Sequence, residues 1–120
     1  MWYILDEKNN PVKSTVLISC AWLEKNPDKH FVKQENIKKA FVSTVFLGLD
    51  HSWLDHSEPL LWETMIFGNT KHDQYQKRYS SYEDALKGHE TAVKLLKKEK
   101  YGMVYNLWNW FFDRVPLWNK

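Results

Sequence analysis

The chain has 120 residues, of which 43% are hydrophobic, 27% charged and 16% aromatic, with seven Trp among them. This composition fits one folded domain and excludes a disordered chain. The net charge is +2, and only two of the 17 basic residues are Arg. Since duplex nucleic acid is usually read through Arg side chains, we expect no duplex nucleic acid as a partner.

Turn and capping residues divide the first third of the chain. Residues 1–5 predict a strand, residues 6–11 a turn, and residues 12–14 a short returning strand. Thr15 is expected to cap a helix that runs to about Lys25. Its apolar stripe is expected to be buried and consists of Val16, Ser19, Cys20 and Leu23. A short strand at residues 30–34 follows.

The centre of the chain predicts an antiparallel hairpin. Residues 41–49 and 60–67 are rich in β-branched and aromatic side chains, and the loop of residues 50–59 separates them. Residues 74–79 are expected to add a short edge strand.

A helix is predicted from Ser80, with Ser80 and Glu83 as a capping box and Glu90 paired with Lys94 on its outer face. One face of this helix is expected to meet the core through Ala85, Leu86, His89, Ala92, Val93 and Leu96. The fold class expected is α+β, a sheet of three to five antiparallel strands packed with this helix. An N-terminal and a C-terminal helix complete the expected fold.

Residues 101–120 are expected to form an aromatic extension to a domain that spans residues 1–100. A helix at residues 103–113 carries an apolar stripe that would close the core, or would pack on a second subunit or a host protein. The interface residues expected there are Trp108, Trp110, Phe111, Phe112 and Trp118.

The single cysteine, Cys20, cannot form an internal disulfide, which indicates a reducing compartment. No charged and apolar leader opens the chain, and no apolar run is long enough to cross a bilayer. We therefore expect a cytoplasmic protein that has no membrane partner.

Four segments carry a resemblance to a known family. Residues 43–51, 59–68, 78–80 and 88–90 read STVFLGLDH, PLLWETMIFG, RYS and GHE. In this order they resemble a small family of bacteriophage and prophage proteins, over roughly residues 1–96, although residues 52–58 depart from the Gly-rich loop of that family. The resemblance implies an accessory role in the host cytoplasm, including counter-defence, in which some phage proteins sequester nucleotide immune signals and others block a host enzyme.

Three polar residues in or beside predicted elements are candidates for chemistry. Glu63 is either a structural ion-pair partner or a ligand-facing carboxylate. His89, on an apolar helix face, is either a satisfied core residue or a ligand donor. With His51 at a strand end, these two would form a two-histidine, one-carboxylate metal site if the three converged, which is the basis of an alternative function as a metal-dependent hydrolase.

Arg78 and Tyr79 place a cation and an aromatic ring before the N-terminus of the predicted helix, where an anion is favoured. The alternative is an Arg–carboxylate pair and a core tyrosine. The expected ligand-binding residues are Thr44, His51, Glu63, Thr64, Arg78, Tyr79 and His89. Because the chain has no phosphate-binding Gly-rich loop and no nucleophile elbow, no cofactor is expected.

The function favoured by the sequence is therefore sequestration of a small nucleotide-type signal, without catalysis, by a protein that forms homo-oligomers. The alternative is an inhibitor that occludes a host enzyme through the aromatic extension.

Overall fold

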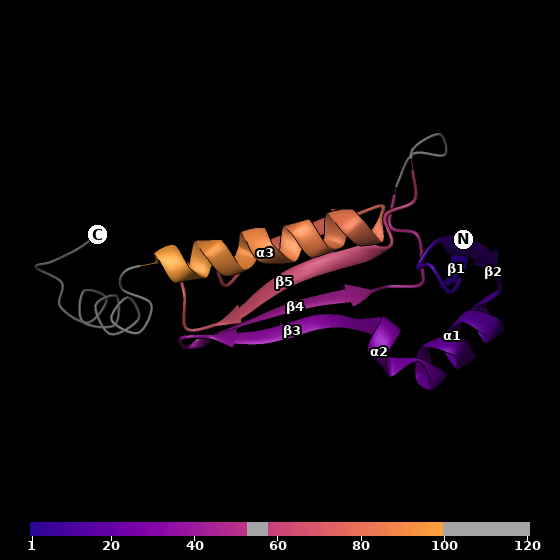
Figure 1. Ribbon diagram of the computed structural model, residues 1–120, viewed down its shortest axis with the longest axis horizontal. Helices are drawn as coiled ribbons and strands as arrows, with labels where there is room; N and C mark the ends of the chain where they lie inside the picture. The colour runs from indigo at the N-terminus through magenta and orange to yellow at the C-terminus, as the bar shows by residue number, and fades with distance from the viewer. Residues whose placement is uncertain (53–57, 100–120) are drawn as a thin grey trace, which may run out of the picture.

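Four antiparallel strands, in the order β3-β4-β5-β6, form the main sheet of the protein (Figure 1). The computed structural model describes residues 1–52 and 58–99. The four strands are β3 (Phe31–Ile37), β4 (Ala40–Phe46), β5 (Trp62–Gly68) and β6 (Gln76–Tyr79). The predicted β4–β5 hairpin and the β6 edge strand are confirmed. β4 ends at Phe46, earlier than expected. Gly48 has a φ of 78°, which lies outside the extended region, so the strand does not continue to Leu49.

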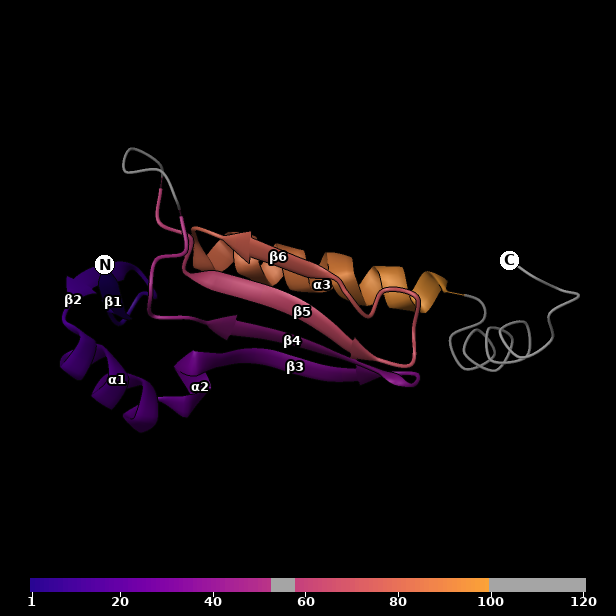
Figure 2. The ribbon, with the colours of Figure 1, turned by 180° about the vertical axis from the view of Figure 1, so that it is seen from behind.

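Helix α3 (Tyr82–Lys98) lies along one face of this sheet. Strand alternation turns Val42, Thr44 and Phe46 toward that face, and all three are fully buried. Figure 2 views the opposite face, where no helix of the described part of the chain crosses the strands. The protein is thus an α+β structure with a two-layer arrangement of helix on sheet, as the sequence predicts.

The start of α3 differs from the prediction by one residue. Ser81, not Ser80, is the N-cap, and its hydroxyl accepts a hydrogen bond from the Asp84 N–H at 3.1 Å. The Ser80 hydroxyl instead donates to the Glu58 carboxylate at 2.9 Å. Glu90 is paired with Lys33 rather than with Lys94.

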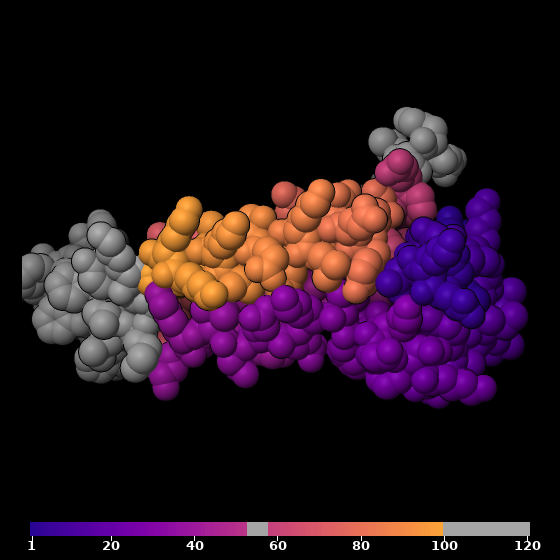
Figure 3. All heavy atoms as spheres, in the orientation of Figure 1, coloured from indigo at the N-terminus to yellow at the C-terminus, as the bar shows by residue number. Residues whose placement is uncertain are grey.

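A second, two-stranded sheet opens the chain and packs with two helices at one end of the main sheet (Figures 1 and 3). Its elements are β1 (Trp2–Leu5), β2 (Pro11–Ser14), α1 (Val16–Lys25) and α2 (Pro27–His30). The predicted hairpin, and the cap in which the Thr15 hydroxyl accepts from the Ile18 N–H at 3.3 Å, are confirmed. The short helix α2, which begins at a proline, was not predicted.

The buried face of α1 also differs from the prediction. Ser19 is fully buried and donates its hydroxyl to the Tyr3 carbonyl at 2.7 Å. Trp22 and Leu23 pack against the core, but Val16 is 47% exposed and Cys20 is exposed. The helix is turned so that Cys20 faces outward, because the polar Ser19 satisfies a buried backbone carbonyl that Cys20 does not reach.

The core is formed by two hydrophobic clusters under α3. The cluster next to the N-terminal elements contains Phe46 and Trp62, whose ring centroids lie 5.2 Å apart. The other cluster joins Val42 and Ile66 to the second half of α3. Together they fix the sheet against the helix along its length.

The C-terminal end of α3 is fastened to two turns of the sheet. The Glu99 carboxylate accepts from the Thr70 hydroxyl at 2.6 Å and from the Lys71 N–H at 3.1 Å, and Lys38 donates to the Glu99 carbonyl. Burial opposes the charged form, but these donors hold the pKa of Glu99 below its ordinary value. The predicted C-terminal helix and its five interface residues lie outside the described residues.

Candidate functional site

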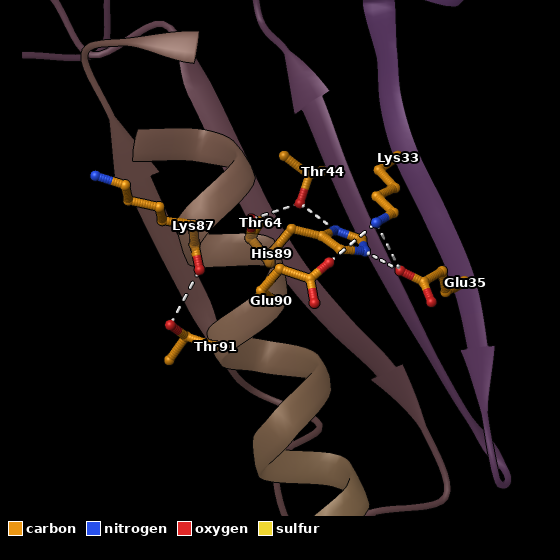
Figure 4. A network of polar contacts seen from close by, with 8 residues as sticks. All are labelled: Lys33, Glu35, Thr44, Thr64, Lys87, His89, Glu90 and Thr91. Carbon is orange, nitrogen blue, oxygen red and sulfur yellow. Dashed lines mark hydrogen bonds and ion pairs between the residues drawn. The ribbon is translucent and has the colours of Figure 1, made fainter. Parts of the chain in front are cut away.

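A chain of four polar side chains crosses the protein between the sheet and α3 (Figure 4). Thr64 on β5 and Thr44 on β4 are cross-strand partners whose Oγ1 atoms lie 2.6 Å apart. The Thr44 Oγ1 lies 2.7 Å from Nδ1 of His89, and the His89 Nε2 lies 2.8 Å from Oε1 of Glu35 on β3. The chain therefore joins three strands to the helix.

Chemistry fixes the direction of these hydrogen bonds when the imidazole is neutral. A carboxylate only accepts, so Nε2–H of His89 donates to Glu35. Nδ1 must then accept from the Thr44 hydroxyl, and Thr44 in turn accepts from Thr64. Thr44 and His89, in the middle of the chain, each form hydrogen bonds with the residues on both sides. The polar groups of both are therefore satisfied, as a buried polar network requires.

Burial closes this chain to ligands. Thr44, Thr64 and His89 are each 0% exposed. They are held by one another, so the structure supports the core interpretation of His89 and leaves these three residues outside any accessible site. Glu35 was missed because the predicted strand ended at Gln34; its extension to Ile37 places Glu35 on the α3 face.

The Glu35 end of the chain reaches solvent beside Lys33 and Glu90. Lys33 Nζ lies 2.9 Å from Glu90 and 3.6 Å from Glu35. The Glu90 carboxylate raises the pKa of Lys33, and Lys33 lowers the pKa of Glu90. Exposed pairs of this kind contribute little to stability.

Glu63 lies on the opposite face of the sheet, because adjacent residues of a strand point to opposite sides. It is 8% exposed and its Oε2 accepts from Arg78 Nε at 2.9 Å and from Gln76 Nε2 at 2.7 Å. The structural ion pair, one of the two interpretations of Glu63, is the one observed. For Arg78, the observed interaction is likewise the alternative given above, an ion pair with a carboxylate, here that of Glu63.

His51 does not join Glu63 and His89 in a metal site. Its Nδ1 lies 2.7 Å from the carbonyl oxygen of Leu49, while Glu63 and His89 are separated by the sheet. Within residues 1–52 and 58–99 no three metal-ligating side chains come together. The structure therefore gives the hydrolase alternative no assembled centre.

The neighbouring Asp50 closes the loop that follows β4. Its Oδ1 accepts from the N–H groups of Ser52 at 2.8 Å and Leu60 at 2.9 Å. Burial favours the neutral acid, but these two donors outweigh it and hold the pKa of Asp50 below its usual value. Its role is to hold the two ends of the loop together.

Within the described residues, an accessible cleft lies between edge strand β6 and the first half of α3. This cleft has a volume of about 380 Å³. Its lining consists of Leu60, Lys77, Arg78, Tyr79, Ser80, Asp84, Lys87, Gly88 and Thr91. A second hollow of about 330 Å³ shares Leu60, Lys77 and Arg78, so the two hollows flank the strand.

Two lysines give this cleft its charge. Lys77 stands on β6 and Lys87 on α3, and within the described residues neither ammonium group has an ion-pair partner. Asp84 is the acidic residue of the lining. The sequence carried a signal for both lysines, since alternation places Lys77 on the face of Tyr79 and helical spacing places Lys87 between Asp84 and Thr91.

Tyr79 belongs to the inner wall of the cleft rather than to an open stacking surface. It is 7% exposed, and its ring lies against Gly88 of α3. Burial raises the pKa of its hydroxyl above the ordinary value. Of the seven predicted ligand residues, the structure therefore brings only Arg78 and Tyr79 to the cleft.

No helix in the described part of the chain has the length and apolar character needed to cross a bilayer. Compared with known protein families, curated proteins and solved structures, the chain matches none.

Proposed function

We propose that the protein binds a small anionic ligand of the nucleotide class in the cleft between β6 and α3. The observation that carries the proposal is the placement of Lys77 and Lys87 on the two elements that form the cleft of about 380 Å³. Neither ammonium group has an ion-pair partner among the described residues. Small-molecule sites commonly have volumes of about 300–1,000 Å³. The backbone of edge strand β6 supplies polar groups for orientation, whereas the Thr91 hydroxyl donates to the Lys87 carbonyl at 3.0 Å.

Binding without catalysis is the simplest use of this surface. A sequestering protein needs only complementary charge and shape, and it lowers the free concentration of its ligand by mass action. Together with the resemblance to phage accessory proteins, this supports a counter-defence role in which a nucleotide immune signal is withdrawn in the host cytoplasm. The alternative, occlusion of a host enzyme by the aromatic extension, rests on residues outside the described part and stays a prediction.

The experiment is a thermal-shift screen of the full chain against cyclic dinucleotides, cyclic ADP-ribose and ADP-ribose, followed by calorimetry. A ligand that binds only the folded state raises the Tm. We expect one of these anions to do so, and the double variant Lys77→Ala/Lys87→Ala to weaken its binding at least about tenfold through the loss of two charge-assisted contacts.

Lys94→Ala is the matched control, because Lys94 lies on the exposed outer face of α3 and is absent from the cleft lining. It should leave the affinity unchanged. Equal affinity of the wild type and the double variant would disprove the site, and recovery of a cleaved ligand after denaturation would disprove binding without catalysis.

A further inference from the structure

Helix α1 exposes most of its apolar side chains to solvent. Leu17 is 81% exposed, Ile18 56% and Val16 47%, whereas Ser19 is the fully buried residue of the helix. A helix that is hydrophobic on all sides is normally enclosed on all sides. The described part of the chain covers only one side of α1.

The exposed side chains form one continuous surface. At 100° per residue, Leu17 lies at the centre of the outward arc, with Val16 and Cys20 on one side and Ile18 and Ala21 on the other. These five residues are called the α1 patch. No charged residue occurs from Thr15 to Leu23, and Glu24 follows Leu17 two turns later on the same stripe. Contiguous apolar surfaces of this kind mark contact sites.

We propose that the α1 patch binds the α1 patch of a second copy of this chain, as an antiparallel helix pair about a two-fold axis. In such a dimer the same surface meets itself, which requires a patch that does not repel its own image. The uncharged centre meets this condition. The antiparallel arrangement also brings Glu24 of each copy, on the stripe of Leu17, toward the start of the other helix, where the helix dipole favours a negative charge. Lys25 lies nearer the edge of the arc, on the stripe of Ile18.

The dimer surface is separate from the ligand cleft. β3 and β6 are opposite edges of the main sheet, and α1 lies on the β3 side in both ribbon views (Figures 1 and 2). A pair of chains joined through α1 therefore keeps both clefts open. Each dimer would present two independent sites.

Sedimentation equilibrium of the full chain over a wide concentration range tests the proposal. We expect a monomer–dimer equilibrium, and we expect Leu17→Glu to weaken it at least about tenfold, because the substitution buries a charge at the centre of the interface. Leu17 is 81% exposed, so this variant should keep the fold and the Tm of the monomer.

Two full-length variants are controls. Each control introduces Glu at a position outside the α1 patch. Phe67 is 44% exposed on the sheet face that no described helix covers, and Trp110 belongs to the predicted C-terminal interface. Both Phe67→Glu and Trp110→Glu should remain dimeric. A wild type that stays monomeric, or a dimer that Leu17→Glu leaves intact while Trp110→Glu dissociates it, overturns the proposal.

Cys20 supplies an independent readout. It is exposed within the patch and is the only cysteine, so a bismaleimide can link Cys20 only to another chain. We expect covalent dimers from the wild type and their loss in Leu17→Glu. Flotation of the wild type with neutral phosphatidylcholine vesicles, lost in Leu17→Glu, would assign the patch to a lipid surface and overturn the proposal.

Discussion

At the scale of the residue, Gly88 is required by its neighbour across the sheet–helix boundary. A Cβ at this position would lie 2.0 Å from Oη and 2.1 Å from Cζ of Tyr79. In an unconstrained helix, Gly→Ala would stabilise the protein by up to about 1 kcal/mol. Here the Tyr79 ring occupies the space, so an added Cβ would force the ring out of its place.

We therefore predict that Gly88→Ala lowers the free energy of unfolding by about 2 kcal/mol or more, opposite in sign to its helix propensity. Urea denaturation would measure it. In a Tyr79→Leu background the cost should shrink, since the ring is gone, and an additive double-mutant cycle would show that the contact is not the cause.

At the scale of the element, Glu35 and His89 hold β3 to α3. β3 is an edge strand that pairs only with β4 among the described strands. The buried chain of Figure 4, together with the exposed Lys33–Glu90 ion pair, links it to the helix. A shift in the register of β3 by one residue would turn Glu35 to the opposite face. The polar chain thus specifies register as well as adding stability.

His89→Leu should cost about 1–3 kcal/mol of unfolding free energy, because the nonpolar side chain deprives both Thr44 and Glu35 of a hydrogen-bond partner. Glu90→Gln, which removes only the exposed pair with Lys33, should change stability far less. Urea midpoints of the two variants give the comparison, and equal midpoints for wild type and His89→Leu would contradict the assigned role.

Much of the secondary structure could be predicted because its signals are local. The β4–β5 hairpin has β-branched alternation, Thr15 is a capping residue, and β6 follows a turn. The orientation of α1 was predicted only in part. Ser19 and Leu23 of the expected stripe face the core, but Trp22 packs there instead of Val16 and Cys20, since apolar residues occur all around the helix. The choice depends on a tertiary contact, the Ser19 hydroxyl on the Tyr3 carbonyl.

The candidate site could be predicted only in part, because the pairing of its residues also depends on tertiary contacts. The sequence offered polar residues on plausible faces but did not show which ones pair. Glu63 and Arg78 are opposite each other in the β5–β6 register, so they satisfy one another. The lysines of the cleft lie on two elements whose approach only the fold determines.

At the scale of the whole molecule, the two proposals use opposite edges of one sheet and should not interact. Leu17→Glu is expected to leave ligand affinity per chain unchanged, and Lys77→Ala/Lys87→Ala to leave the dimerisation constant unchanged. Calorimetry and sedimentation of both variants test this. A change of either constant by more than about threefold, roughly 0.7 kcal/mol, would reveal a coupling between the two surfaces.

The buried chain and the Tyr79–Gly88 contact bring together stretches that are far apart in the sequence. The segments that resemble the phage family contribute Thr44, Thr64, Tyr79, Gly88 and His89, which touch one another beneath α3. These are contacts of the interior, so they hold α3 against the sheet, and Thr44, Thr64 and His89 form no part of the wall of the cleft. Lys77 and Lys87 lie outside these segments, so substitutions there would change the charge of the cleft without altering the interior contacts.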